Sequence, residues 1–230
     1  TVLSRGLGDV YKRQIDRLAT SGYKSNVTGF SLGTQFEFLD DLRLGLSTKN
    51  NIEKIDVDSN ASSRQKKQDG NYFDSFIGLD FIYDKRNQKY QTTDGFFSNY
   101  NVNVPIISDT NTLTNIYNYK IFKELYENNV STLSLLFKTA NSLSSDDVKL
   151  SERLYLPGRR LRGFESGKVG PKDGSDFIGG NYVSSINATT TLPVIFQNVQ
   201  NVDVVMFADA ANIWGVDYDS SLDKSGIRSS

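Results

Sequence analysis

Hydrophobic and polar residues alternate with a period of two along almost the whole chain from residue 26 onward. In the first such stretch, Phe30 and Leu32 share one face of an extended chain, whereas Ser31 and Gly33 share the other. This alternation is typical of β-strands with one apolar and one polar face, and no segment shows a competing helical period. The pattern predicts about eight strands and the start of a truncated one near Gly226. Their expected ranges are 28–38, 42–47, 73–84, 96–104, 117–125, 130–139, 182–194 and 202–214.

The connections between the predicted strands alternate in length. Outer-membrane barrels alternate short periplasmic turns with long external loops, whereas a soluble sandwich has no reason to do so. The sequence therefore predicts an all-β chain, a fragment of a transmembrane antiparallel β-barrel. Further strands must complete the barrel, because lipid tolerates no unpaired strand edge. Short turns are expected near 39–41, 85–94, 127–128 and 196–201, and longer polar loops near 58–70, 107–113, 141–178 and 215–225.

The composition fits a barrel wall and removes several classes of function. The 12 Tyr and 14 Phe residues suit aromatic girdles at the two membrane interfaces. No apolar run approaches the length of about 18 residues that a transmembrane helix needs. The chain has no histidine and no cysteine, which excludes a serine-type triad, thiolate metal ligands and disulfides. A net charge of -1 gives no case for binding nucleic acid, and we expect no catalytic residue, metal or cofactor.

The first 14 residues, TVLSRGLGDVYKRQ, resemble translated sequencing-adapter read-through rather than native protein. We expect residues 1–14 to be a non-native leader, with a genuine strand or turn as the alternative. The remaining 15–230 then form a partial barrel domain that is truncated before its last strands.

The longest predicted loop, from about 141 to 178, combines positive charge with apolar residues. Loops of this length in compact domains are functional or disordered. A disordered linker seldom carries so many apolar side chains, so we expect this loop to pack against the barrel. Its arginines are Arg153, Arg159, Arg160 and Arg162, and its apolar residues include Leu154, Tyr155, Leu156, Leu161, Phe164 and Phe177.

Three sequence motifs follow one another along the chain. They are DKRN at 84–87 followed by TDGF at 93–96, LRGF at 161–164 followed by FIGGNY at 177–182, and FADAANIWG at 207–215. Together they resemble the Omp85 superfamily of outer-membrane barrels, which includes the bacterial surface antigen D15 type. The resemblance covers about 26–230, and it is strongest to the members that assemble other barrel proteins.

The resemblance implies that the long loop folds back into the barrel lumen. There Arg162 pairs with an acidic residue of the inner wall, and the matching position is Asp209. Strand parity agrees, because Asp209 shares a face with Phe207 while the small apolar residues beside them suit lipid. Gly163 lets the backbone turn or approach the wall closely, and Phe164 can pack beside it.

One position departs from the family pattern. Where the family often has a glutamate on the preceding strand, this chain has Thr189. Arg162 then has a single carboxylate partner, or it uses Asp176 or Glu165 as a secondary partner. In the periplasmic turn motif of Asp84, Arg86 and Gly95, the Asp–Arg pair is interpreted as stabilising the turn.

The function implied by the resemblance is that of an outer-membrane assembly factor, which folds and inserts β-barrel proteins by templating at an edge strand. Its partners are unfolded barrel clients, outer-membrane lipids and accessory lipoproteins that bind N-terminal domains absent here. The location is the outer membrane of a Gram-negative bacterium. The alternatives are a secretion or translocation pore of the same superfamily, including TamA-like and two-partner secretion proteins, a passive porin, and an outer-membrane lipase or protease. The absence of histidine and of a nucleophile-elbow motif disfavours the enzyme.

Overall fold

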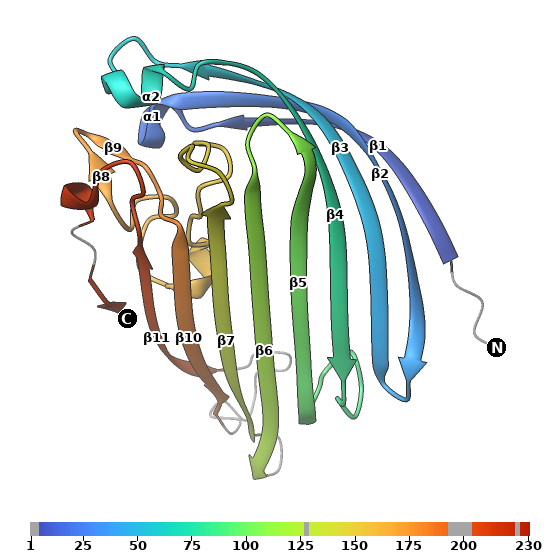
Figure 1. Cartoon of the computed structure of the whole chain (residues 1–230). Coiled ribbons are helices and arrows are strands. Elements are labelled where there is room, and N and C mark those ends of the chain that lie inside the picture. The colour runs from blue at the N-terminus through green and yellow to red at the C-terminus, as the bar shows by residue number, and fades with distance from the viewer. Residues whose placement is uncertain (1–4, 127–128, 193–203, 224–225) are drawn as a thin grey trace.

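The computed structural model describes residues 5–126, 129–192, 204–223 and 226–230. These residues form one ten-stranded antiparallel sheet, in which neighbouring strands follow the order of the chain. Figure 1 shows that the sheet curves strongly about an open concave side, as a barrel wall does before its edges meet. The predicted fold class, an antiparallel β-barrel fragment, is confirmed. The strands of this sheet are β1 (Arg5–Asp16), β2 (Tyr23–Leu39), β3 (Leu42–Val57), β4 (Gly70–Asp84), β5 (Asp94–Ser108), β6 (Thr112–Tyr126), β7 (Asn129–Ser142), β10 (Tyr182–Thr191), β11 (Val205–Trp214) and β12 (Arg228–Ser229).

The remaining elements are short and lie in the connections. A two-stranded hairpin consists of β8 (Lys172–Asp173) and β9 (Asp176–Phe177). The helices are α1 (Leu18–Ser21) and α2 (Ser63–Lys66), with single 3-10 turns η1 (Gly158–Arg160) and η2 (Ser220–Leu222). None of the helices found in the described residues has the length and hydrophobicity that crossing a membrane requires.

The segment expected to be a foreign leader has a place in the sheet. Strand β1 pairs with β2 from Arg5, opposite Gln35, to Asp16, opposite Lys24. Residues 5–14 are therefore part of the described fold, while their non-native origin stays a prediction.

Several strands extend beyond their predicted ends. Strand β3 was expected to finish near residue 47 but continues to Val57, paired with β2 and β4 over this length. Between residue 47 and Val57 the apolar residues of β3 no longer share one face. Ile52 is 64% exposed and Ile55 is fully buried, so the extension lacks the regular pattern of a membrane wall. The predicted turns at 127–128 and 196–201 lie outside the described residues.

The two faces of the sheet differ as the alternation predicts. On the convex face an apolar row crosses three strands, with Leu46 of β3 opposite Leu79 of β4 and Leu79 opposite Val102 of β5. Many large apolar side chains on this face remain exposed, as expected for a surface that meets lipid rather than a protein core. They include Phe30, Leu32, Leu79, Phe81, Tyr100, Tyr117, Leu133 and Phe137.

The buried core lies on the concave side, beneath the connection between β7 and β10. We call this connection, residues 143–181, the inner loop; Figure 1 shows it within the curve of the sheet. Its Leu156, Leu161 and Val169 pack with Val183 of β10 and with Ala211 and Ile213 of β11. At the other side of the wall, Leu150 packs with Tyr23 of β2 and Ile55 of β3. The inner loop thus has its own apolar contacts with both ends of the sheet, as its composition predicts.

Candidate functional site: the attachments of the inner loop

The structure brings Arg162 and Asp209 together on the concave face. Arg162 Nε donates to Asp209 Oδ2 at 2.7 Å, and Arg162 Nη2 donates to Oδ1 at 2.6 Å. The backbone N–H of Arg162 adds a third bond to Oδ2 at 3.0 Å. A guanidinium and a carboxylate that share two parallel bonds fix orientation as well as distance. The Asp209 side chain is fully buried and that of Arg162 is 32% exposed, so the ion pair is open to solvent on the side of the guanidinium.

Further groups hold this ion pair in place. Asn187 Nδ2 donates to Asp209 Oδ1 at 2.8 Å, and Arg162 Nη2 reaches the hydroxyl of Thr189 at 3.3 Å. The guanidinium lies 3.7 Å from the ring centroid of Phe207, which places that ring on the inner face and adds a cation–π contact. Asp209 therefore has partners on both sides, and Thr189 supplies a neutral acceptor where the family often has a carboxylate.

The alternative acidic partners are not used by Arg162. Glu165 pairs with Lys168 at 2.9 Å, and the carboxylate of Asp176 lies beside Gly22. Among the residues that the structure describes, Asp209 is thus the one carboxylate that forms an ion pair with Arg162.

The two residues after Arg162 have separate roles. Gly163 has a positive φ of 81°, and a Cβ added there would meet nothing within 4 Å. The position therefore needs glycine for the turn, not for a close approach to the wall. Phe164 is 38% exposed and borders a cavity that Phe177 and Leu222 also line.

Arg160 enters a pocket of neutral oxygen atoms beside this pair. Its Nη1 donates to Ser134 Oγ at 2.8 Å and to Asn187 Oδ1 at 3.2 Å, and its Nη2 donates to Asn118 Oδ1 at 3.1 Å. Because Asn187 also donates to Asp209, it links the two arginines of the loop tip through one side chain. The tip is therefore attached to β6, β7, β10 and β11 together.

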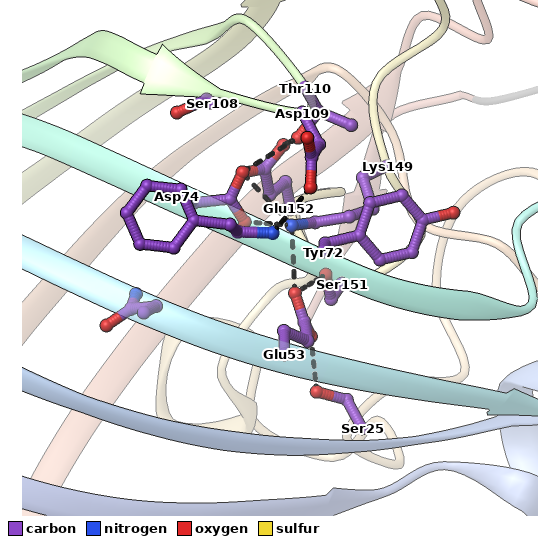
Figure 2. A network of polar contacts seen from close by, with 12 residues as sticks. Ser25, Glu53, Tyr72, Asp74, Ser108, Asp109, Thr110, Lys149, Ser151 and Glu152 are labelled. Carbon is purple, nitrogen blue, oxygen red and sulfur yellow. Dashed lines mark hydrogen bonds and ion pairs between the residues drawn. The ribbon is translucent and has the colours of Figure 1, made fainter.

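A second attachment lies at the start of the inner loop and is centred on Lys149 (Figure 2). The lysine side chain is 1% exposed, and its Nζ lies 2.9 Å from Glu53 of β3 and 3.7 Å from Glu152 of the loop. It also forms an ion pair with Asp74 of β4. Burial opposes the charge on Lys149, but the three carboxylates outweigh it and raise the pKa of the ammonium above its ordinary value. We call these four residues the Lys149 cluster.

Hydroxyl groups complete the Lys149 cluster. Ser151 donates to Glu53 Oε2 at 2.9 Å, and Ser25 of β2 donates to the other oxygen of Glu53. Thr110 lies 3.3 Å from Asp74 Oδ1 and 3.4 Å from Glu152 Oε2. The cluster therefore joins the loop to the wall from β2 to the connection between β5 and β6.

A third attachment connects the inner loop with the connection after β11. Arg153, whose side chain is fully buried, pairs with Asp217 and lies 4.8 Å from the ring of Tyr218. Arg64 of α2 pairs with Asp219, which brings the loop after β3 against the same segment. These contacts tie connections at one end of the sheet to each other.

The turn motif of Asp84, Arg86 and Gly95 has its own local ion pair. Arg86 Nε and Nη2 each donate to one oxygen of Asp84 at 2.8 Å, and the guanidinium lies 5.0 Å from the ring of Phe97. Gly95 has a φ of 98°, and a Cβ there would lie 2.1 Å from the carbonyl oxygen of Lys85. The glycine therefore permits a close approach of two backbone segments at this turn.

Sequence reasoning did not identify the Lys149 cluster or the pairing of Arg153 with Asp217. Strand parity could have placed Asp74 on the inner face, because it alternates with the apolar residues of β4, but Glu53 lies in the second half of β3, where apolar residues occupy both faces. No periodic signal could have placed Lys149, because it lies in an irregular loop and its contact with Asp74 spans 75 residues. No group of histidine, cysteine or acidic residues in the described part of the chain has a geometry that could hold a metal ion.

Comparisons with known proteins agree with the resemblance that the sequence motifs show. The family profile for the Omp85 superfamily domain matches residues 5–230. A crystal structure of BamA from Haemophilus ducreyi lacking POTRA domains 1-3 shares the fold with a TM-score of 0.83, at 20% sequence identity. The match covers 95% of this chain and 48% of that one, so the chain spans about half the length of the BamA structure. Comparison of the sequence with curated proteins finds no match.

Proposed function

Because the chain belongs to the Omp85 superfamily, we propose that it is part of an outer-membrane assembly factor of the BamA type. Such a protein folds β-barrel clients and inserts them into the outer membrane of a Gram-negative bacterium. The observation that carries the proposal is the inner loop, whose LRGF motif is attached to the wall through Arg162 and Asp209 within a BamA-like fold. The polar contacts and charges of the site serve attachment, and the proposal includes no catalytic residue, nucleotide or cofactor.

The proposed mechanism is templating at an open edge of the barrel. An unfolded client strand pairs with an exposed strand edge, where backbone hydrogen bonds are available without sequence specificity. Lipid cannot supply such bonds, so an edge that opens in the bilayer favours the addition of a strand. Unfolded barrel clients and outer-membrane lipids are the partners that this mechanism needs. Accessory lipoproteins that bind the N-terminal domains of such a factor are part of the same proposal.

The residues described here have a mechanical role in this scheme. The inner loop is attached to β3 and β4 through Lys149 and to β10 and β11 through Arg162, so it braces strands far apart in the sheet order. A barrel whose seam opens loses the restraint of a closed ring of hydrogen bonds. A brace across the concave face keeps the remaining wall curved while the seam admits a client strand.

The test is a reconstitution of the full-length protein in liposomes with an unfolded barrel client. We expect these liposomes to accelerate insertion of the client, measured as the protease-protected folded fraction, and Arg162→Ala to reduce the rate. The Lys168→Ala variant removes an exposed charge from the same loop and serves as the matched control. Translocation of a client into the liposome interior without insertion would favour the secretion pore, and passage of small solutes alone would favour a porin.

A further inference from the structure

The Lys149 cluster contains more negative than positive charge in a buried place. One ammonium faces Glu53, Asp74 and Glu152, and these side chains are at most 15% exposed. Buried carboxylates need a cation or hydrogen-bond donors to remain ionised. Glu53 and Asp74 both have such partners: each lies close to Lys149, Glu53 accepts bonds from the hydroxyl groups of Ser25 and Ser151, and Asp74 accepts one from Thr110.

Glu152 is the least compensated member of the cluster. Its nearest approach to Lys149 Nζ is 3.7 Å, beyond hydrogen-bond distance, and its other oxygen lies 3.4 Å from the hydroxyl of Thr110. Two carboxylates of the wall compete with it for the same ammonium. The other ionisable groups that face this space are Asp9, Tyr11 and Arg13 from β1, Lys49 and Glu53 from β3, Tyr72 and Asp74 from β4, and Asp109 after β5.

We propose that Glu152 takes up a proton when the inner loop is docked, so that the Lys149 cluster is a proton-linked anchor that tightens as the pH falls. A protonated carboxyl removes one of the excess negative charges. Its new O–H group can also donate a hydrogen bond to the hydroxyl oxygen of Thr110 or to a neighbouring carboxylate.

The direction of the pH dependence follows from linkage. In the docked loop, burial raises the pKa of Glu152 from its ordinary 4.5 to about 7, although Lys149 acts in the opposite sense. When the loop is undocked and solvated, the pKa returns to the ordinary value. The docked state therefore binds more protons between these two values, and its stabilisation is complete at low pH and lost as the pH rises through about 7. The equilibrium constant for docking of the inner loop should therefore be about tenfold larger at pH 6 than at pH 8.

A buried thiol provides a measurement of docking that is sensitive to rare opening. The chain has no cysteine, so Val148→Cys introduces a single thiol one residue from Lys149, at a side chain that is fully buried. In the full-length protein in liposomes, the rate of maleimide labelling is divided by the rate in denatured protein at the same pH. This ratio removes the pH dependence of the thiol itself. We expect protection to be about tenfold greater at pH 6 than at pH 8.

Two further variants identify the responsible carboxyl. Glu152→Gln keeps the shape of the protonated acid, and we expect strong protection at both pH values. Glu165→Gln changes an exposed carboxylate of the same loop, and we expect the wild-type pH dependence to remain. Equal protection at pH 6 and pH 8 in the wild type, or a tenfold change that survives in Glu152→Gln, would overturn the proposal. Infrared absorption of a protonated carboxyl, present in the wild type at pH 6 and absent in Glu152→Gln, checks the same step independently.

Discussion

Removing Arg162 should weaken the inner loop more than removing its partner Asp209. The carboxylate is fully buried, whereas the guanidinium is 32% exposed and can turn toward water when its partner is lost. In Arg162→Ala the carboxylate loses two charge-assisted bonds but keeps Asn187 and the backbone N–H of residue 162. The expected ranking of the two variants rests on this difference in burial.

The contacts of Arg162 and Asp209 set the expected loss of stability in each variant. Breaking a fully buried ion pair costs about 3–5 kcal/mol, and the partners that Asp209 retains bring Arg162→Ala to about 3 kcal/mol. Asp209→Ala should cost about 1–2 kcal/mol, because the freed arginine is solvated. The double variant should cost little more than Arg162→Ala, which gives a coupling energy of about 1–2 kcal/mol. Arg162→Lys keeps the charge but not the paired donors, and it should recover only part of the loss.

A double-mutant cycle on urea unfolding in lipid vesicles measures these values in the full-length protein. Protease cleavage between residues 163 and 170 provides a second, local measure of loop release. The control is the exposed pair of Lys168 and Glu165, where either alanine variant should cost less than about 0.5 kcal/mol. Additive losses for Arg162→Ala and Asp209→Ala, or a greater cost for Asp209→Ala, would refute the reasoning from burial.

Three other predictions concern the wall. Leu79→Arg on the convex face should impair membrane integration by about 2–4 kcal/mol, while Asn101→Arg on the concave face should cost far less; equal losses in an insertion assay would contradict the assignment of faces. A cysteine at Ser63 should be labelled from outside intact cells and one at Asp40 should be protected, and the reverse result would invert the topology. Gly95→Ala should destabilise the barrel by about 1–3 kcal/mol from its positive φ alone, measured as a lower urea midpoint.

Sequence and structure agree most closely where the chain is regular. Strand parity placed Asp209 on the inner face, which its ion pair with Arg162 of the inner loop confirms, and it placed Leu79 on the opposite face, where the side chain is exposed. This information is local, because a period of two assigns each residue of a strand to one side. The pattern weakened in the second half of β3, where Ile52 and Ile55 lie on opposite faces, and the predicted strand was too short there.

The pairing of Arg162 with Asp209 was also accessible from the sequence, through a family motif on the loop and a matching aspartate 47 residues later. The Lys149 cluster could not be predicted from the sequence. Glu53, Asp74 and Lys149 lie far apart in the chain, and an irregular loop gives no periodic signal of where its side chains point. Their meeting depends on how strongly the sheet curves and on how deeply the loop enters it. The sequence alone thus determined the strands, their faces and the motif pair, because local alternation and short motifs encode them. Only the tertiary structure decided which charges the loop buries, because burial depends on the curvature of the whole wall.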